Sequence, residues 1–185
     1  MTQSFRQFFV HIKGIELQSA VINCDGEDDQ VATVELDQRF IYDTYGVTMP
    51  EANAEFTAGK TYRIIFKYKA KILDDITGVY CAMDSDTKHK LKPKLDELGY
   101  KSIKDLQLIQ DEELRDQIID HTVFCTNLEP AEARTFLPCI DEPLFKARFK
   151  LTINLTEKQV INQHTAISNT PVESRSEDGK KITFE

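Results

Sequence analysis

The sequence contains no hydrophobic run long enough to cross a membrane. No stretch approaches the roughly 18 consecutive apolar residues of a spanning helix. The N-terminal stretch MTQSFRQFFVHIKG also lacks the continuous apolar region of a secretory signal peptide. These two absences predict a cytoplasmic protein that makes no use of a membrane.

Positive charge is also scarce. The chain has 23 Lys and Arg residues against 31 Asp and Glu residues, which gives a formal net charge of −8. Nucleic acids and anionic membranes repel such a chain at long range. We therefore expect neither as a partner, and neutral or cationic ligands are favoured instead.

The cysteines show no paired spacing. Cys24, Cys81, Cys125 and Cys139 form no CxxC motif and no pattern typical of metal ligands. We interpret them as reduced, mostly buried, small hydrophobic residues. The sequence thus predicts neither a disulfide framework nor a cysteine-bound metal.

Composition and periodicity indicate a globular β-rich chain. With 185 residues, 41% of them hydrophobic and 29% charged, the chain is long enough to bury the core of a single domain spanning residues 1–185. Apolar and polar residues alternate in several stretches without intervening crossover helices, which favours antiparallel pairing. We predict a mainly β fold, an antiparallel sandwich or saddle-like double sheet, with strands at 8–13, 15–23, 31–36, 61–72, 121–128, 147–155, 165–169 and 181–184.

The stretch 84–120 has a helical period instead. Leu91, Leu95 and Leu98 are spaced for one face of a helix that Gly99 ends, and Pro93 either delays the start of that helix or kinks it. Two further short helices are predicted, with Ser102 and Asp111 as their N-caps. We expect a small helical insertion within the β domain.

The densest motif is TNLEPAEARTFLPCIDEP, residues 126–143, which we call the motif segment. It places a carboxylate, Glu129, directly before a proline and then passes through a short helix-compatible run. Prolines fix φ near −65° and bias the preceding residue away from the helical region. The segment is therefore predicted to be a rigid connection that can hold a side chain in place.

These residues carry a resemblance to a known family. The run TNLEPAEARTFLPCIDEPLFKARFKLTINL resembles the N-terminal β-domain of the aminopeptidase N family of zinc metallopeptidases, which includes the puromycin-sensitive type. The upstream stretches FFVHIKGIELQSA, AGKTYRIIFKYKAKI and GVYCA are similar to earlier strands of that domain, and HTAISNTPVES to the strands that follow. The similarity leaves out the family's first and last strands, so we expect a truncated domain.

The resemblance implies roles for individual residues. Glu129 corresponds to a glutamate that helps bind the free α-amino group of a substrate, and a fixed carboxylate can hold an ammonium by charge-assisted hydrogen bonds. Alternatively, Glu129 only stabilises the start of a following helical turn. Asn127 stands where the family usually has glutamine, which shortens that substrate-facing side chain. The structural members of the motif are expected to be Arg134, Pro138, Cys139, Asp141 and Pro143.

The family's catalytic motif is absent from this sequence. Its zinc peptidases need an HExxH helix and a distant glutamate ligand, whereas His11, His89, His121 and His164 include no pair at i, i+4 spacing. We therefore expect no catalytic residue, no metal ligand and no cofactor in this chain, with zinc only in a separate catalytic domain. The predicted function is a non-catalytic domain that packs on a catalytic metallopeptidase domain or another protein and contributes to recognition of a peptide N-terminus.

Two other functions stay open. The helical insertion would make the chain a stand-alone protein-interaction module if it bound a partner helix. Alternatively, Cys125 or Cys139 would act as the nucleophile of an independent hydrolase with His121 as its base, which requires nucleophile and base to meet within hydrogen-bond distance.

Overall fold

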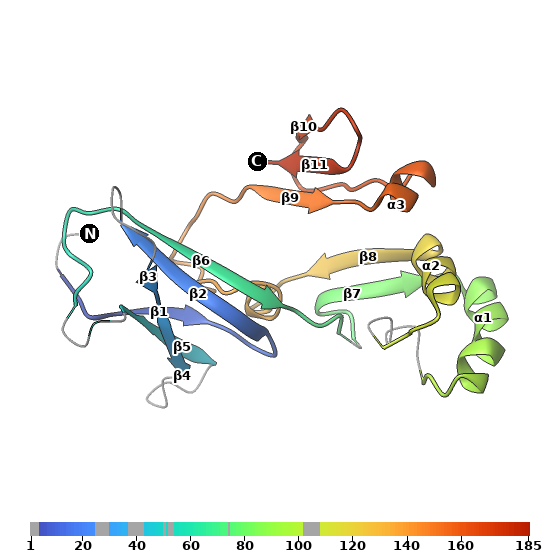
Figure 1. Ribbon diagram of the computed structural model, residues 1–185, viewed down its shortest axis with the longest axis horizontal. Coiled ribbons are helices and arrows are strands. Elements are labelled where there is room, and N and C mark those ends of the chain that lie inside the picture. Colours follow the sequence, from blue (N-terminus) through green and yellow to red (C-terminus); the bar gives the residue numbers. More distant parts are fainter. Residues whose placement is uncertain are drawn as a thin grey trace. The chain divides into compact units, whose positions relative to one another are not determined.

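The computed structural model describes residues 4–24, 30–36, 43–49, 51, 54–73, 75–101 and 108–185. These residues form two compact units. Unit 1 comprises residues 1–81 with 124–145, and unit 2 comprises residues 82–123 with 146–185. Antiparallel strands dominate the described chain, so the prediction of a mainly β fold is confirmed (Figure 1). Whether residues 1–185 act as one domain with residues 84–120 as an insertion stays a prediction.

Unit 1 is built on two three-stranded antiparallel sheets. One has the order β1-β5-β4 and the other the order β3-β2-β6. Gly14 adopts φ +66° in the turn between β1 and β2, a conformation that costs glycine little. The strands are β1 (Gln7–His11), β2 (Glu16–Cys24), β3 (Gln30–Val31), β4 (Thr33–Leu36), β5 (Thr44–Thr48) and β6 (Tyr62–Lys69).

Residues from both sheets form one hydrophobic core, which fits the predicted sandwich. Its buried members are Val10, Ile12, Ile22, Val47 and Phe56. Each large apolar side chain buried in this way contributes on the order of 1.5 to 3 kcal/mol before conformational entropy is subtracted. Half-buried and exposed residues alternate strictly along β6. The strand predicted at 61–72 therefore has one face toward the core and one toward solvent, as its alternation of apolar and polar residues indicates.

A two-stranded sheet of β7 (Gly78–Met83) and β8 (Thr122–Asn127) leads into the motif segment. Figure 1 shows the two strands side by side. The last two residues of β8, Thr126 and Asn127, are also the first two residues of the motif segment. The strand therefore fixes where this segment starts.

Two helices of unit 2 form where the sequence predicts them. α1 (Ser85–Glu97) continues through Pro93, and α2 (Glu112–Asp120) is capped by Asp111, whose side chain accepts a hydrogen bond from the Leu114 N–H. Gly99 ends α1 with φ +78°, and the Tyr100 N–H donates to the Leu95 carbonyl as in a Schellman motif. Of the predicted middle helix that starts at Ser102, residues 102–107 lie outside the described residues.

The three-stranded sheet of unit 2 has the order β10-β11-β9 and is also antiparallel. The strands are β9 (Leu151–Asn154), β10 (Val172–Arg175) and β11 (Lys181–Phe184), and α3 (Glu157–Ile161) follows β9 with a complete capping box between Thr156 and Gln159. Ile182 and Phe184 of the central strand are buried, at 0% and 2% exposure.

Two strand predictions in this unit are wrong. Residues 165–169 form no strand, because the turn at 177–179 closes a hairpin between the stretches directly next to it, and these are β10 and β11. Residues 147–150 also form no strand. The pairing of β9 with β11 runs only from Leu151 to Asn154. Phe149 is accordingly 65% exposed.

Among the residues that the structure describes, no helix has the length and the apolar character needed to span a membrane.

Candidate functional site

The motif segment lies entirely in unit 1, whose second stretch runs from Phe124 to Phe145. It is held mainly by hydrogen bonds among its own residues and with β1 and the turn after it. After β8 the chain makes a turn in which the Glu132 N–H donates to the Leu128 carbonyl, 3.0 Å away. The Glu129–Pro130 peptide bond is cis. A short 3₁₀ helix, η2 (Ala133–Thr135), follows close to the helix-compatible run that the sequence indicates.

The side chains of Arg134 and Asp141 form an ion pair that links the start and the end of residues 134–141. The Arg134 Nε lies 3.0 Å from Asp141 Oδ2, and the two side chains are only 8% and 13% exposed. The Arg134 N–H also donates to Asp141 Oδ2, and Arg134 Nη2 donates to the Asp141 carbonyl. A buried ion pair is stable only when its remaining donors and acceptors are satisfied, as they are here.

The end of β1 and the turn after it hold the segment at two places. At the first, the N–H of Lys13 in this turn donates to the Arg134 carbonyl, and Lys13 Nζ lies 3.0 Å from Glu132 Oε1. At the second, His11 and Cys139 exchange backbone hydrogen bonds, and the Asp141 N–H donates to His11 Nδ1. The segment is therefore anchored on both sides of η2.

Glu129 differs from the other acidic residues of the segment. Its side chain is exposed, and among the described residues it makes no hydrogen bond or ion pair, whereas Glu132 binds Lys13 and Asp141 binds Arg134. η2 begins at Ala133 and has no acidic residue in its first turn. This arrangement gives no support to Glu129 as a helix-stabilising carboxylate and leaves its oxygens open to a ligand.

Asn127 is also exposed, but its amide has a partner. Asn127 Nδ2 donates to the Ile76 carbonyl, 2.9 Å away. The side-chain oxygen and the second amide N–H are then left for a substrate group. Asn127 lies two residues before Glu129, and its amide also makes a hydrogen bond within the protein.

The remaining motif residues have different degrees of burial. Pro138 and Cys139 are half-buried and Pro143 is exposed. All four cysteines are free among the described residues. Burial raises the pKa of the Cys139 thiol to about 11, with the Asp141 carboxylate as a further cause. A thiol with a raised pKa is a poor nucleophile because the thiolate is the reactive form.

Comparisons with known proteins match the part of the chain that contains the motif segment. Residues 100–185 match the model of the peptidase M1 N-terminal domain family. This match covers the motif segment, α2 and the sheet of unit 2. The predicted resemblance to the N-terminal domain of these aminopeptidases is confirmed.

Several curated aminopeptidases are similar to part of this chain. Probable aminopeptidase 2 of Sulfurisphaera tokodaii is 42% identical over 69 residues, which is 36% of this chain and 8% of the relative. Leucyl aminopeptidase of Saccharolobus solfataricus is 39% identical over 66 residues, again 36% of this chain and 8% of the relative. Endoplasmic reticulum aminopeptidase 2 of Bos taurus is 46% identical over 50 residues, 27% of this chain and 5% of the relative. The aligned part thus spans less than a tenth of each relative.

Among the described residues, no set of three or more His, Cys, Asp and Glu side chains is arranged to hold a metal ion. His11 Nδ1 already accepts a hydrogen bond, and His164 faces Asp120 at 3.3 Å. These two histidines therefore already have polar partners within the chain.

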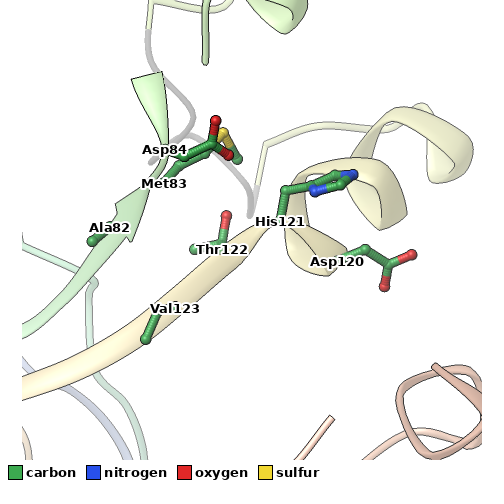
Figure 2. Close-up of a pocket in the computed structure, with 7 residues that line it drawn as sticks. All are labelled: Ala82, Met83, Asp84, Asp120, His121, Thr122 and Val123. Atoms are coloured by element: carbon green, nitrogen blue, oxygen red, sulfur yellow. The ribbon is translucent and has the colours of Figure 1, made fainter. Parts of the chain in front are cut away.

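One shallow pocket of about 390 Å³ lies in unit 2, lined by Ala82, Met83, Asp84, Asp120, His121, Thr122 and Val123 (Figure 2). Its carboxylates already have partners. Asp84 caps α1 by accepting from the Thr87 N–H, and Asp120 Oδ2 accepts from Asn162 Nδ2. His121, the proposed hydrolase base, lines this pocket (Figure 2). We assign no ligand to it.

The sequence alone did not identify the residues that hold the segment from outside. His11 is the last residue of β1 and Lys13 lies in the turn after it, and they are 130 and 119 residues away from Asp141 and Glu132. No motif marks them. The only available signal was that β1 is one of the stretches that resemble the M1 N-terminal domain.

Proposed function

We propose that this chain is a non-catalytic part of an aminopeptidase-like zinc metallopeptidase, and that Glu129 binds the free α-amino group of a peptide substrate. The observation that carries the proposal is the exposed Glu129 carboxylate, which has no partner among the described residues and lies on a segment anchored on both sides of η2 by β1 and the turn after it. An anchored carboxylate binds an ammonium group with less loss of side-chain and loop freedom than one on a loose loop.

The catalytic part would come from a separate metallopeptidase domain that supplies the zinc. The described residues offer no set of metal ligands, so the role left for this chain is binding and positioning. The family match and the aminopeptidase names of the relatives support this assignment. A cytoplasmic location stays a prediction.

The two other functions have less support. In unit 2 Ile109, Leu114 and Ile118 are at 2% exposure or less and so are not available to a partner helix, which leaves Leu98 and Leu108, at 46% and 66% exposure, as the apolar contacts on offer. A cysteine hydrolase needs an activated thiolate, and the raised pKa of Cys139 works against one.

The amine-binding role is tested by NMR on the ¹⁵N-labelled full chain. Leucinamide and N-acetyl-leucinamide are titrated separately up to several hundred millimolar, because a single exposed charge pair gives roughly 1 kcal/mol or less and hence a Kd on the order of 0.1 M. We expect the amide signals of residues 127–129 and 131–132 to shift with leucinamide but not with its acetylated form. Equal shifts with both compounds would exclude recognition of the amine.

Two variants make this test specific. Glu129→Gln removes the charge while keeping the shape, and we expect it to abolish the response to leucinamide. Glu16→Gln is the matched control, because Glu16 is an exposed glutamate on β2 of the same unit. An unchanged response in Glu129→Gln would contradict the proposal.

The absence of catalysis is tested by turnover. The purified chain with added zinc should not hydrolyse a leucine-coupled fluorophore. Turnover that Cys139→Ala or Cys125→Ala abolishes would instead support the hydrolase alternative.

A further inference from the structure

His11 connects β1 to the motif segment through its backbone and through its ring. The His11 N–H donates to the Cys139 carbonyl over 2.7 Å, and the Cys139 N–H donates back over 3.3 Å. Two residues further on, the Asp141 N–H donates to His11 Nδ1 over 3.0 Å. The His11 side chain is 13% exposed, so little water competes for this bond.

The ring bond requires one protonation state. Nδ1 accepts a hydrogen bond only when it carries no proton, so the proton of the neutral ring is on Nε2. Protonation of Nδ1 would place an N–H donor opposite the Asp141 N–H donor. The hydrogen bond is then lost and two like partial charges face each other.

We propose that His11 is an acid-sensitive latch: its neutral ring accepts the Asp141 N–H and holds that amide at the end of β1, and protonation of Nδ1 breaks this bond. This inference concerns the conformation of the segment and holds whether or not Glu129 binds an amine.

The groups around the ring set the direction of its titration. Burial lowers the pKa of His11 from the ordinary value of 6.5, and the Arg134 guanidinium lowers it further. Three carboxylates act in the opposite direction, namely Glu142 and Asp141 on the segment and Asp43 directly before β5. Glu142 Oε1 lies 3.9 Å from His11 Nε2 and remains the group that faces an imidazolium ring.

The sign of the stability effect follows from this lowered pKa. The unfolded chain takes up a proton at His11 near pH 6.5, whereas the folded chain does so only at lower pH. The contribution of the latch to stability is therefore complete above pH 6.5. It decreases as the pH falls through the pKa of the folded state.

The latch acts on only one of the two anchors. Lys13 still binds Glu132 and the Arg134 carbonyl when His11 is charged, and Arg134 still binds Asp141. The backbone hydrogen bonds between His11 and Cys139 also remain. We therefore expect only the Asp141 amide to loosen, while η2 stays in place.

The test is an NMR titration of the full 185-residue chain between pH 8 and pH 4.5. It records the tautomer of His11, the signal of the Asp141 amide and the hydrogen-exchange protection of that amide. We expect His11 to carry its proton on Nε2 at pH 8. The Asp141 signal should move with the midpoint of the His11 titration, and its protection should fall roughly 2- to 10-fold, as expected for the loss of one hydrogen bond.

Two variants separate the latch from general acid effects. His11→Asn offers an oxygen close to the position of Nδ1 and cannot titrate, so Asp141 should stay protected across this pH range. His11→Leu offers no acceptor, so the protection should be low at every pH. Should His11→Leu fail to fold, wild type and His11→Asn suffice. His89→Asn is the control, because His89 is an exposed histidine on α1, and it should leave the response of Asp141 unchanged.

Three results would overturn the proposal. A proton on Nδ1 at pH 8 would remove its basis. Constant protection of the Asp141 amide while His11 titrates would show that the ring holds nothing. The same acid response in His11→Asn would assign the effect to a different group.

Discussion

Arg134 and Asp141 form a buried ion pair that closes the second half of the motif segment, with 3.0 Å between Nε and Oδ2. They are seven residues apart, and the same carboxylate oxygen also accepts the Arg134 N–H. The pair therefore fixes the backbone of the segment as well as two side chains. Its neighbour His11 receives the N–H of the same Asp141.

We expect Asp141→Asn to lower the free energy of unfolding by about 3 to 5 kcal/mol, because it leaves the Arg134 charge buried without a partner. Arg134→Lys should also be strongly destabilising, since an ammonium cannot make the several directed bonds of the guanidinium. Denaturant unfolding measures both changes. The control Arg6→Gln removes the exposed Arg6–Glu55 pair and should cost about 1 kcal/mol or less. An Asp141→Asn variant as stable as this control would contradict the structural role of the pair.

Replacement by alanine should lower the stability more at Gly78 than at Gly14. Both have positive φ, +62° and +66°. A Cβ at Gly78 would overlap Thr135 Oγ1 and lie 2.7 Å from Leu73 Cδ1, whereas a Cβ at Gly14 would have nothing within 4 Å. Gly14→Ala should cost about 1 to 2 kcal/mol for its backbone conformation alone. Gly78→Ala should cost about 1 to 3 kcal/mol more because of the overlap. Equal losses of stability in the two variants would show that Thr135 moves aside freely.

Cys139 should react slowly with alkylating reagents. With a pKa of about 11, roughly one thiol in a thousand is ionised at pH 8. The rate of iodoacetamide labelling, followed by peptide mass spectrometry, should rise about tenfold per pH unit between pH 8 and pH 10. A rate that reaches its plateau below pH 9 would mean an activated thiolate, as the hydrolase alternative requires. Cys125, half-buried on β8, provides the comparison within the same chain.

Asp120 connects α2 to the residues that follow α3 within unit 2. Its carboxylate accepts from Asn162 Nδ2 at 2.8 Å and lies 3.3 Å from His164 Nε2. Asp120→Ala removes both contacts and should lower the stability of unit 2 by about 1 to 2 kcal/mol, given their partial exposure. Hydrogen exchange of the α2 amides should report this loss. As the control, Glu112→Ala removes only a surface contact of 3.9 Å with Arg115 on the same helix. Equal exchange in both variants would show that Asp120 does not hold α2.

Much of the fold could be predicted because the relevant signals are short-range. The alternation along β6, the Asp111 cap of α2 and the left-handed Gly99 each depend on residues within a few positions of one another. The sequence predictions failed where a strand depended on its partner. Residues 165–169 alternate like a strand, but the turn at 177–179 pairs residues 172–175 with β11 instead.

The amino-acid sequence by itself determined the mainly β class, the helical character within 84–120 and the identity of the motif segment, because these are written in local periodicity and in residue order. Only the tertiary structure decided what holds that segment. His11 and Lys13 contact it across 130 and 119 residues of chain, and Thr135 occupies the space that a Gly78 side chain would need. Such contacts depend on which strands pair and in which register, and no local pattern of side chains specifies that.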